Sequence, residues 1–355
     1  MQRIPFSKDE LVVKGEYPSA FRGFPGTKIL STPITPREHY TATVIEGKTP
    51  IWHPMTSDYI TLVPKHIPDN TARALIMDAE PLLEEERGGK DMFGIEWVYV
   101  PAANGSMVQP GTPLLEDANE WEEKLVWPNI EEWDWAGSAE RNKSYLGEGR
   151  AVNVWIMNGM FERLISFMDF EGAVTALIDE DQQDAVHALF TKLCDLYEKI
   201  IDKFIECYGM SQLLFHDDWG SMRAPFFSLA TCQEMLVPYI RRIADYCHSK
   251  GCSFELHSCG ANEMLVPAMI EAHVDVWTPM ANINDVPALY EKYGDQIHFG
   301  YSAPMLPPDA TDEQRYEVAK NYVEKFTQPN KYTIAGAMDP KVREYIYQLS
   351  REKLN

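Results

Sequence analysis

Several features that mark whole classes of protein are missing from this sequence of 355 residues. Lysine and arginine total 32 against 54 acidic residues, which gives a formal net charge of −22. Nucleic acids and anionic membranes need basic surfaces, so this charge argues against both as partners and fits a well-solvated surface. No run approaches the roughly 18 apolar residues of a membrane span, and the first residues lack the apolar segment of a signal peptide. We therefore expect a cytoplasmic protein.

Cysteine is scarce and confined to one part of the chain. All six cysteines lie between Cys194 and Cys259, without the spacing of a disulfide framework. Such thiols are expected to be reduced, and most of them buried, as in a cytoplasmic protein. A G-x-G-x-x-G motif after the first expected strand is also missing, which weakens a dinucleotide-binding interpretation.

The second half of the sequence alternates β-rich apolar runs with helical patterns. This alternation predicts parallel strands joined by helical crossovers, and about eight such units predict an α/β protein of the (β/α)₈ TIM-barrel type. We expect an irregular N-terminal arm over 1–34, one barrel domain over 35–355, and an elaboration at about 81–148. The expected strands are Pro50–Pro54, Phe93–Val100, Val152–Met157, Gln212–His216, Ser253–His257, Val274–Thr278, Ile297–Tyr301 and Tyr332–Ala335.

Two local signals fix expected helix positions. Thr35 is followed by Pro36 and, three residues after Thr35, by Glu38, which is the spacing of a capping box at a helix start. A second helix is expected over 228–250, with Gly251 as its C-terminal cap. Pro238 lies inside that helix and predicts a kink.

The residues most suggestive of chemistry are His257 and Cys259. They end an expected strand two positions apart, so their side chains point the same way, and both are zinc ligands. Asp218 follows the preceding strand and is the expected third ligand, while its neighbour Asp217 is expected to face away. Glu255 shares the parity of His257 and is expected to orient it. H-x-C alone is a weak motif, and two ordinary barrel-interior residues are an equally good interpretation.

In a barrel, active sites lie at the C-terminal ends of the strands, so other strand-end residues become candidates. Asp218 and His257 are the expected catalytic residues. The expected substrate-binding residues are those at or beside the other strand ends: His53, Met157, Asn158, His216, Trp219 and Tyr301.

An ordered set of motifs resembles the uroporphyrinogen decarboxylase superfamily over about residues 35 to 340. The set comprises Thr35–Glu38, Phe93–Trp97, Asp217–Gly220, Phe227–Ser228, Pro238–Tyr239, His248–Gly251 and His257–Gly260. The resemblance implies a (β/α)₈ barrel with its site at the strand C-termini. The decarboxylases of this superfamily carry an arginine-rich signature after the first strand. The matching stretch here, Pro54–Tyr59, holds no arginine, although an octa-acid substrate needs cationic partners.

The other branch of the superfamily comprises zinc-dependent methyltransferases that work with corrinoid proteins, and its H-x-C-G zinc ligands match His257 and Cys259. Thiol methyltransferases add a second cysteine near the last strand, but Thr333–Asp339 has none. Replacing that thiolate with oxygen or nitrogen leaves zinc more electrophilic, which suits an ether oxygen. The resemblance therefore implies a methyltransferase with Zn²⁺, moving a methyl group from a small methoxylated donor, aromatic or not, to cobalamin on a partner protein.

Several alternatives stay open at this point. The protein could be a tetrapyrrole decarboxylase, or a non-catalytic subunit that docks a corrinoid-binding protein. The metal itself could have been lost together with the second cysteine. The sequence does not decide between a monomer and a homodimer, and the donor and the remaining metal ligands also stay open.

Overall fold

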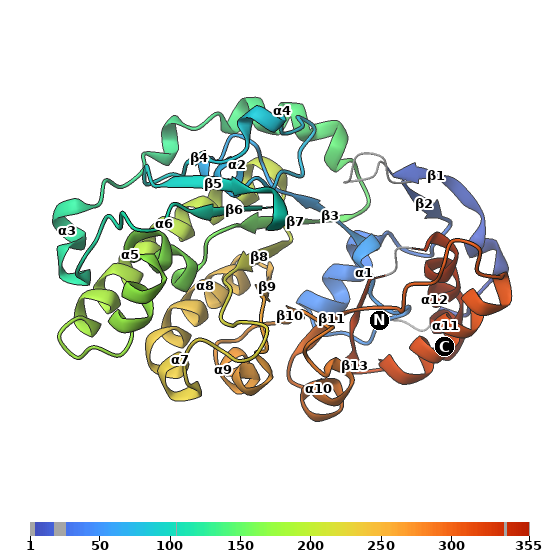
Figure 1. The fold of residues 1–355 in the computed structure, drawn as a ribbon. Helices are drawn as coiled ribbons and strands as arrows, with labels where there is room; N and C mark the ends of the chain where they lie inside the picture. Colours follow the sequence, from blue (N-terminus) through green and yellow to red (C-terminus); the bar gives the residue numbers. More distant parts are fainter. Residues whose placement is uncertain (1–3, 18–25, 104, 337–338, 355) are drawn as a thin grey trace.

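A computed structural model describes residues 4–17, 26–103, 105–336 and 339–354. Its centre is a curled parallel sheet with the strand order β14-β11-β10-β9-β8-β7-β3 (Figure 1). Six of these strands fall on the β-rich runs expected in the second half of the chain, so that part of the prediction is confirmed. The seven strands are β3 (Tyr59–Leu62), β7 (Ala151–Ile156), β8 (Gln212–His216), β9 (Ser253–Ser258), β10 (Val276–Pro279), β11 (His298–Ser302) and β14 (Ile334–Gly336).

The two edges of this sheet approach each other without a further strand between them. One parallel bridge joins Met55 to Ala335, and the Ala335 N–H donates to the Pro54 carbonyl at 2.9 Å. The strand expected at Pro50–Pro54 is wrong: that segment is irregular. Its two prolines have no N–H, and the His53 N–H donates to the hydroxyl of Ser350 instead of to a strand. The described residues thus form a curled seven-stranded sheet whose edges are linked by a single bridge.

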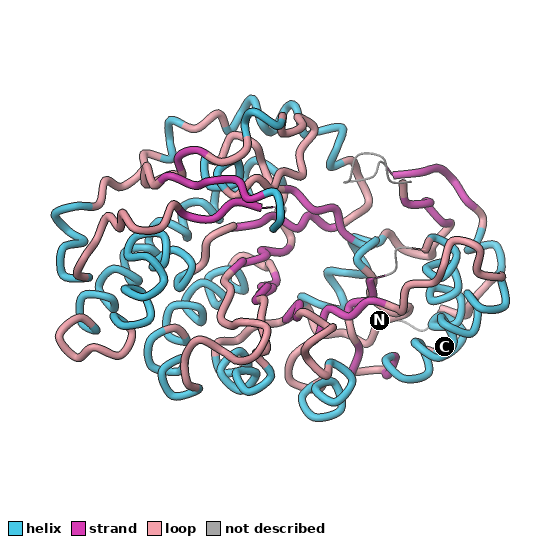
Figure 2. The backbone as a smooth tube through the Cα atoms, in the orientation of Figure 1, coloured by secondary structure: helices cyan, strands magenta, loops and turns pink. Residues whose placement is uncertain are grey.

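Helices cover the convex face of the sheet, as the ribbon and tube views show (Figures 1 and 2). The helices bury the convex face of the strands, and the curl of the sheet encloses the concave face. All five residues of β8 are accordingly buried. The covering helices are α5 (Met160–Ala176), α6 (Gln183–Tyr208), α7 (Leu229–Met235), α8 (Val237–Ser249), α9 (Val266–Glu271), α10 (Val286–Tyr293), α11 (Asp312–Phe326) and α12 (Pro340–Lys353).

Both local helix signals are confirmed. Helix α1 (Pro36–Tyr40) starts with the expected capping box: Thr35 Oγ1 accepts the Glu38 N–H, and the Glu38 carboxylate accepts the Thr35 N–H. The helix expected over 228–250 is divided into α7 and α8, with Pro238 in the first turn of α8. Proline has no N–H to donate, so it is tolerated at a helix start but not inside a helix. Gly251 follows α8 at φ +73°.

The N-terminal arm and the elaboration contain structure that the sequence did not predict. The arm includes an antiparallel hairpin that lies beside α12 (Figure 1). The elaboration carries a small antiparallel sheet in the order β4-β5-β6, so the strand expected at Phe93–Val100 begins only at Glu96. The remaining elements are β1 (Val13–Tyr17), β2 (Thr27–Leu30), α2 (Pro68–Ala72), β4 (Gly89–Lys90), β5 (Glu96–Val100), β6 (Gly105–Val108), α3 (Trp121–Lys124), α4 (Trp135–Leu146), β12 (Thr327–Gln328) and β13 (Lys331–Tyr332).

Within the described ranges, no helix is both long enough and apolar enough to cross a bilayer. The six cysteines all carry free thiols, and four of them are buried.

Candidate functional site

The strand register brings two histidines together at the C-terminal ends of β8 and β9. His216 and His257 are direct partners across these parallel strands. Residues in register on neighbouring strands point to the same face, so the two imidazoles lie side by side, with ring centroids 4.8 Å apart. The sequence predicted both strand ends, and the pairing follows from the register.

Two further donor groups lie beside His257. The Asp218 Oδ1 atom is 4.0 Å from His257 Nε2, and the Cys259 Sγ atom is 3.2 Å from the same nitrogen. Asp218 also accepts the Cys259 N–H at 2.6 Å, which ties the loop after β8 to the loop after β9. The expected association of Asp218, His257 and Cys259 is present in the structure.

Asp217 faces away from this cluster, as expected for its neighbour in sequence. Its buried carboxylate accepts the backbone N–H groups of Phe161 and Glu162 at the start of α5. Because a helix N-terminus attracts negative charge, Asp217 holds α5 in place. Gly159 makes room for this contact, since a Cβ atom there would lie 2.4 Å from the Asp217 Cβ. Burial raises the pKa of Asp217 to about 7.

A carboxylate from α5 binds the back of His216. The Glu162 Oε2 atom lies 2.6 Å from His216 Nδ1, and Glu162 Oε1 accepts a 2.7 Å hydrogen bond from Arg73. This contact leaves Nε2 as the free ring nitrogen of His216. A carboxylate that holds the far nitrogen of an imidazole is the usual support of a metal-binding histidine.

The charge states follow from burial and from these neighbours. Burial lowers the pKa of His257 to about 3, so its ring is neutral at pH 7. Burial alone would lower the pKa of His216, but the Glu162 carboxylate raises it. Burial opposes ionisation of Glu162, while Arg73 and His216 bring its pKa down to about 2. Burial, with the nearby Asp218 charge, raises the pKa of the Cys259 thiol to about 12.

The donor set fits a zinc ion. His216, Asp218 and His257 each offer one ligand atom, and these atoms all lie within 4.8 Å of one another. A tetrahedral zinc with ligands at about 2.0–2.3 Å needs donor atoms roughly 3.3–3.8 Å apart. A small contraction would bring these three donors to that spacing. The Cys259 sulfur, which lies 3.2 Å from His257 Nε2, would have to move closer to the other two donors to become the fourth ligand. A bound cation would also lower the pKa of the thiol and make it a thiolate ligand.

A cavity of about 220 Å³ lies inside the curled sheet, and His257 forms part of its wall. We call it the inner cavity. Its walls are formed by residues of the strands and of the segments next to them. Half-buried Tyr301 is one of the lining residues, as predicted. The residues that line it are Thr56, Tyr59, Thr61, Asn153, Trp155, Leu214, Glu255, His257, Thr278, Pro279, Ala281, Gly300, Tyr301, Ser302, Ile334 and Gly336.

Two of the predicted substrate-binding residues lie away from the inner cavity, in the core. His53 is fully buried, and its ring nitrogens lie 2.7 Å from the Thr327 hydroxyl and 3.3 Å from that of Thr333. Trp219 is also fully buried, and its indole N–H donates to Asp217.

Met157 and Asn158 lie behind the cluster rather than in the cavity. Met157 packs in a small apolar group with Val63 and Met77. Asn158 accepts a hydrogen bond from Arg73 and donates one to Asp69. A strand-end position marks the right layer of the barrel, but the pleat and the loop that follows decide which side chains enter the cavity.

Glu255 does not orient His257, contrary to the expectation. Its oxygens accept hydrogen bonds from the Thr278 hydroxyl at 2.6 Å and from the Asn153 amide at 3.2 Å. His257 is instead held by a backbone hydrogen bond with Thr278. Burial raises the pKa of Glu255 to about 7.

Four residues of the site were not predicted from the sequence. Two support His216 and two line the inner cavity: Arg73, Glu162, Tyr59 and Trp155. Glu162 follows the end of β7 by six residues, inside a helical pattern, and no motif distinguishes it from a surface glutamate. Trp155 was within an expected strand, but the choice of Met157 and Asn158 assumed that the last residues of the strand face the cavity.

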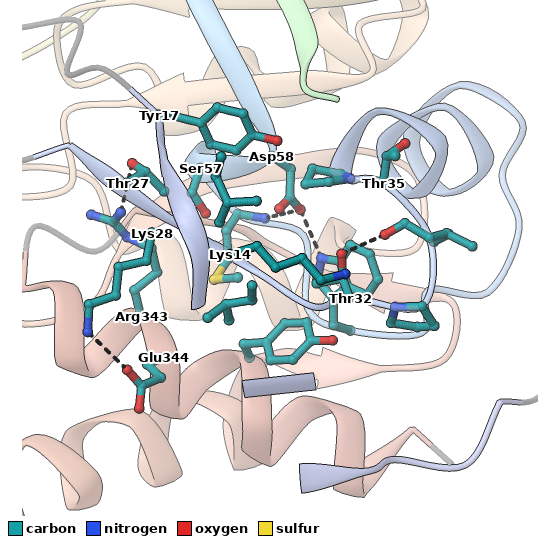
Figure 3. Close-up of a pocket in the computed structure, with 18 of the residues that line it drawn as sticks. Lys14, Tyr17, Thr27, Lys28, Thr32, Thr35, Ser57, Asp58, Arg343 and Glu344 are labelled. Carbon is teal, nitrogen blue, oxygen red and sulfur yellow. Dashed lines mark hydrogen bonds and ion pairs between the residues drawn. The ribbon is translucent and has the colours of Figure 1, made fainter. Parts of the chain in front are cut away.

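A second cavity of about 370 Å³ lies outside the sheet, beneath the β1–β2 hairpin (Figure 3). We call it the outer cavity; it is bounded by the hairpin, α12 and the segment 52–58. Most of its charged side chains have partners within the protein. Lys28 lies 3.6 Å from Glu344, Arg343 donates to the Thr27 hydroxyl, and Asp58 accepts the Met55 N–H. The single group of metal-ligating side chains found among the described residues lies at the inner cavity instead.

One of the comparisons with known proteins finds a similar fold. No protein-family model matches this chain, and no curated protein matches it either. A methyltransferase from Methanosarcina mazei has a similar solved structure, with a TM-score of 0.60, 14% sequence identity, and coverage of 90% of this chain and 99% of that chain. At this identity the likeness shows the fold alone. A D-psicose 3-epimerase solved with D-fructose has a TM-score of only 0.37 at 14% identity over 63% of this chain and 83% of that chain.

Proposed function

We propose that this protein is a zinc-dependent methyltransferase that moves a methyl group from a small methoxylated donor to a corrinoid carried by a partner protein. The observation that supports it most is the convergence of His216, Asp218 and His257, with the Cys259 thiol next to His257, which forms part of the wall of the inner cavity. The likeness in fold to a protein described as a methyltransferase adds support. The corrinoid partner comes from the sequence resemblance.

His216, Asp218, His257 and Cys259 would hold the ion. A zinc ion in this set would act as a Lewis acid that polarises the ether oxygen of the donor. This ligand set has one thiolate where the thiol methyltransferases have two, so it donates less electron density to zinc and suits an oxygen donor better than a thiol. Glu162 holds His216 in one tautomer, and Arg73 keeps Glu162 ionised.

The proposed reaction breaks the carbon–oxygen bond of the donor, and the electron pair of that bond stays on oxygen. The methyl carbon bonds to the cobalt(I) of the acceptor corrinoid, whose electron pair makes the new bond. The demethylated oxygen takes up a proton from solvent, which completes the alcohol or phenol product. The chain's part is to position the ether beside the cluster and to keep bulk water out of the inner cavity.

The same geometry disfavours the tetrapyrrole decarboxylase. Ligand pockets for drug-sized molecules have about 300–1,000 Å³, and the inner cavity, at about 220 Å³, is smaller. The residues that line it include no arginine or lysine to pair with the carboxylates of a porphyrinogen.

Metal content and methyl transfer together test the proposal. The purified protein is expected to hold one zinc per chain, and to form methylcobalamin from cob(I)alamin and a methoxylated donor. His257→Ala should lose the metal and at least 100-fold in rate. The matched control is His273→Asn, which removes a surface imidazole that binds only Asp245.

The proposal is wrong if the wild-type protein contains no zinc and His257→Ala transfers methyl groups at the wild-type rate. Corrinoid-protein binding without any turnover would instead identify a docking subunit.

A further inference from the structure

The inner cavity has an unusual distribution of polar groups. Three aromatic side chains line it, those of Tyr59, Trp155 and Tyr301. One carboxyl group, that of Glu255, is present in its wall. Of the residues that line it, none is a lysine or an arginine. The nearest cation of the cluster, Arg73, does not line the cavity and is bound to Glu162 and Asn158.

The size of the inner cavity limits the ligand to one ring. An apolar cavity of about 150 Å³ accommodates benzene, so a cavity of about 220 Å³ has room for one benzene ring and a few substituent atoms. The aromatic walls suit the faces and edges of such a ring. Trp155 is held in place because its indole N–H donates to the side-chain amide oxygen of Asn153 at 2.5 Å.

Glu255 can accept further hydrogen bonds. Its two oxygens accept one bond each from the protein, from Thr278 and from Asn153. A carboxyl group has acceptor positions beyond these two bonds whether it is ionised or neutral, so at least one is left for a ligand. The wall that contains Glu255 therefore favours a hydrogen-bond donor. A carboxylate placed there would be buried without a cation, which is costly.

We propose that the methyl donor is a methoxylated phenol whose ring hydroxyl donates to Glu255, and that methoxylated benzoates are rejected. This rests on the proposed function, because the methoxy group must face the metal ligands. His257 and Glu255 are on the same strand two residues apart, so they project to the same side of β9. A single ring can therefore contact Glu255 with its hydroxyl while its methoxy oxygen lies at His257.

Calorimetric titration at pH 7 tests this proposal without turnover. The probes are a methoxyphenol, the methoxybenzoate with the same substitution pattern, and methoxybenzene, on zinc-loaded protein. The methoxyphenol is expected to bind at least fivefold more tightly than methoxybenzene and at least tenfold more tightly than the benzoate.

The variant Glu255→Gln should cut the preference for the phenol over the benzoate at least threefold. The control Glu291→Gln, at an exposed position on α10, should leave it unchanged. Equal or tighter binding of the benzoate, or no binding of any probe, would overturn the proposal. Because the wild-type ranking carries the main result, a misfolded variant does not remove the test.

Failure of this inference and failure of the proposed function give different results. If methyl transfer proceeds equally from the phenol and the benzoate, the function stands and the specificity is wrong. If the phenol binds as expected but no methylcobalamin forms, the cavity assignment stands and the function is wrong.

Discussion

The outer cavity is larger than the inner cavity, but the side chains that could bind a metal lie beside the inner cavity. The outer cavity is the larger, at about 370 Å³ against about 220 Å³. Most of its charged side chains have partners within the protein, as the Lys28–Glu344 pair shows (Figure 3). Beside the inner cavity, His216, Asp218 and His257 bring three ligand-type atoms within 4.8 Å of one another from neighbouring strand ends. A functional site is marked by ligand-type atoms that converge, more than by the volume of the space beside them.

The largest effect expected from a residue behind the cluster is that of Glu162→Gln. The amide keeps the size of the side chain but no longer carries the charge that holds His216 in one tautomer. Loss of such a supporting group typically weakens metal binding about 10–100-fold. Competition with a zinc chelator should show this weakening. The control Glu198→Gln breaks an ion pair with Arg242 elsewhere and should keep wild-type affinity. An unchanged zinc affinity in Glu162→Gln would contradict the role of Glu162 as the support of His216.

An intermediate effect is expected from His53, which lies in the segment that separates the two cavities. Burial lowers the pKa of His53 to about 3, so it is neutral in the folded protein and titrates near 6.5 when unfolded. The unfolded state therefore binds more protons below pH 6.5, and stability falls as the pH decreases. From pH 6.5 to 5 this histidine alone should cost about 1–2 kcal/mol.

Chemical denaturation of the wild type and of His53→Gln across that range would measure this cost. His39, also buried with a lowered pKa, contributes a loss of the same sign, so the variant should show a shallower pH dependence and not a flat one. Parallel curves for the two proteins would show that His53 is not a buried neutral group.

The smallest effect is expected at the outer cavity. Glu344→Gln removes the partner of Lys28, whose side chain is 52% exposed. Exposed ion pairs contribute about 0–1 kcal/mol, so the melting temperature should shift only slightly. Zinc content and methyl transfer should match the wild type. A loss of transfer in a variant that folds and holds zinc would show that the outer cavity takes part in function, and would undo the contrast between the two cavities.

Periodicity and turn residues were enough to place the strands of the second half of the chain and the start of α1. The run Ser253–His257 became β9, and Thr35 and Glu38 formed the capping box of α1. These features depend on neighbours within a few residues, so the sequence can specify them. The stretch Pro50–Pro54 was misjudged because its apolar content suggested a strand, whereas the His53 N–H is taken by Ser350, which lies 297 residues away.

The residues of the candidate site also divide into those that local sequence indicates and those that only distant contacts reveal. His257, Cys259 and Asp218 could be found because ligand-type residues follow strand ends. Glu162 could not, because its importance comes from the 2.6 Å contact with His216, across 54 residues of sequence. The second cysteine that thiol methyltransferases supply is missing over Thr333–Asp339; residues 337 and 338 of that stretch lie outside the described residues.

By itself, the sequence determined the strands of the second half of the chain, the start of α1 and the chemical types of the ligands, because local patterning and side-chain chemistry set all three. Only the tertiary structure decided which donors meet. The parallel register pairs His216 with His257, the Asp217 contact with α5 places Glu162 behind the cluster, and the curl of the sheet encloses the inner cavity. Each depends on hydrogen bonds between residues far apart in sequence, and no local pattern records them.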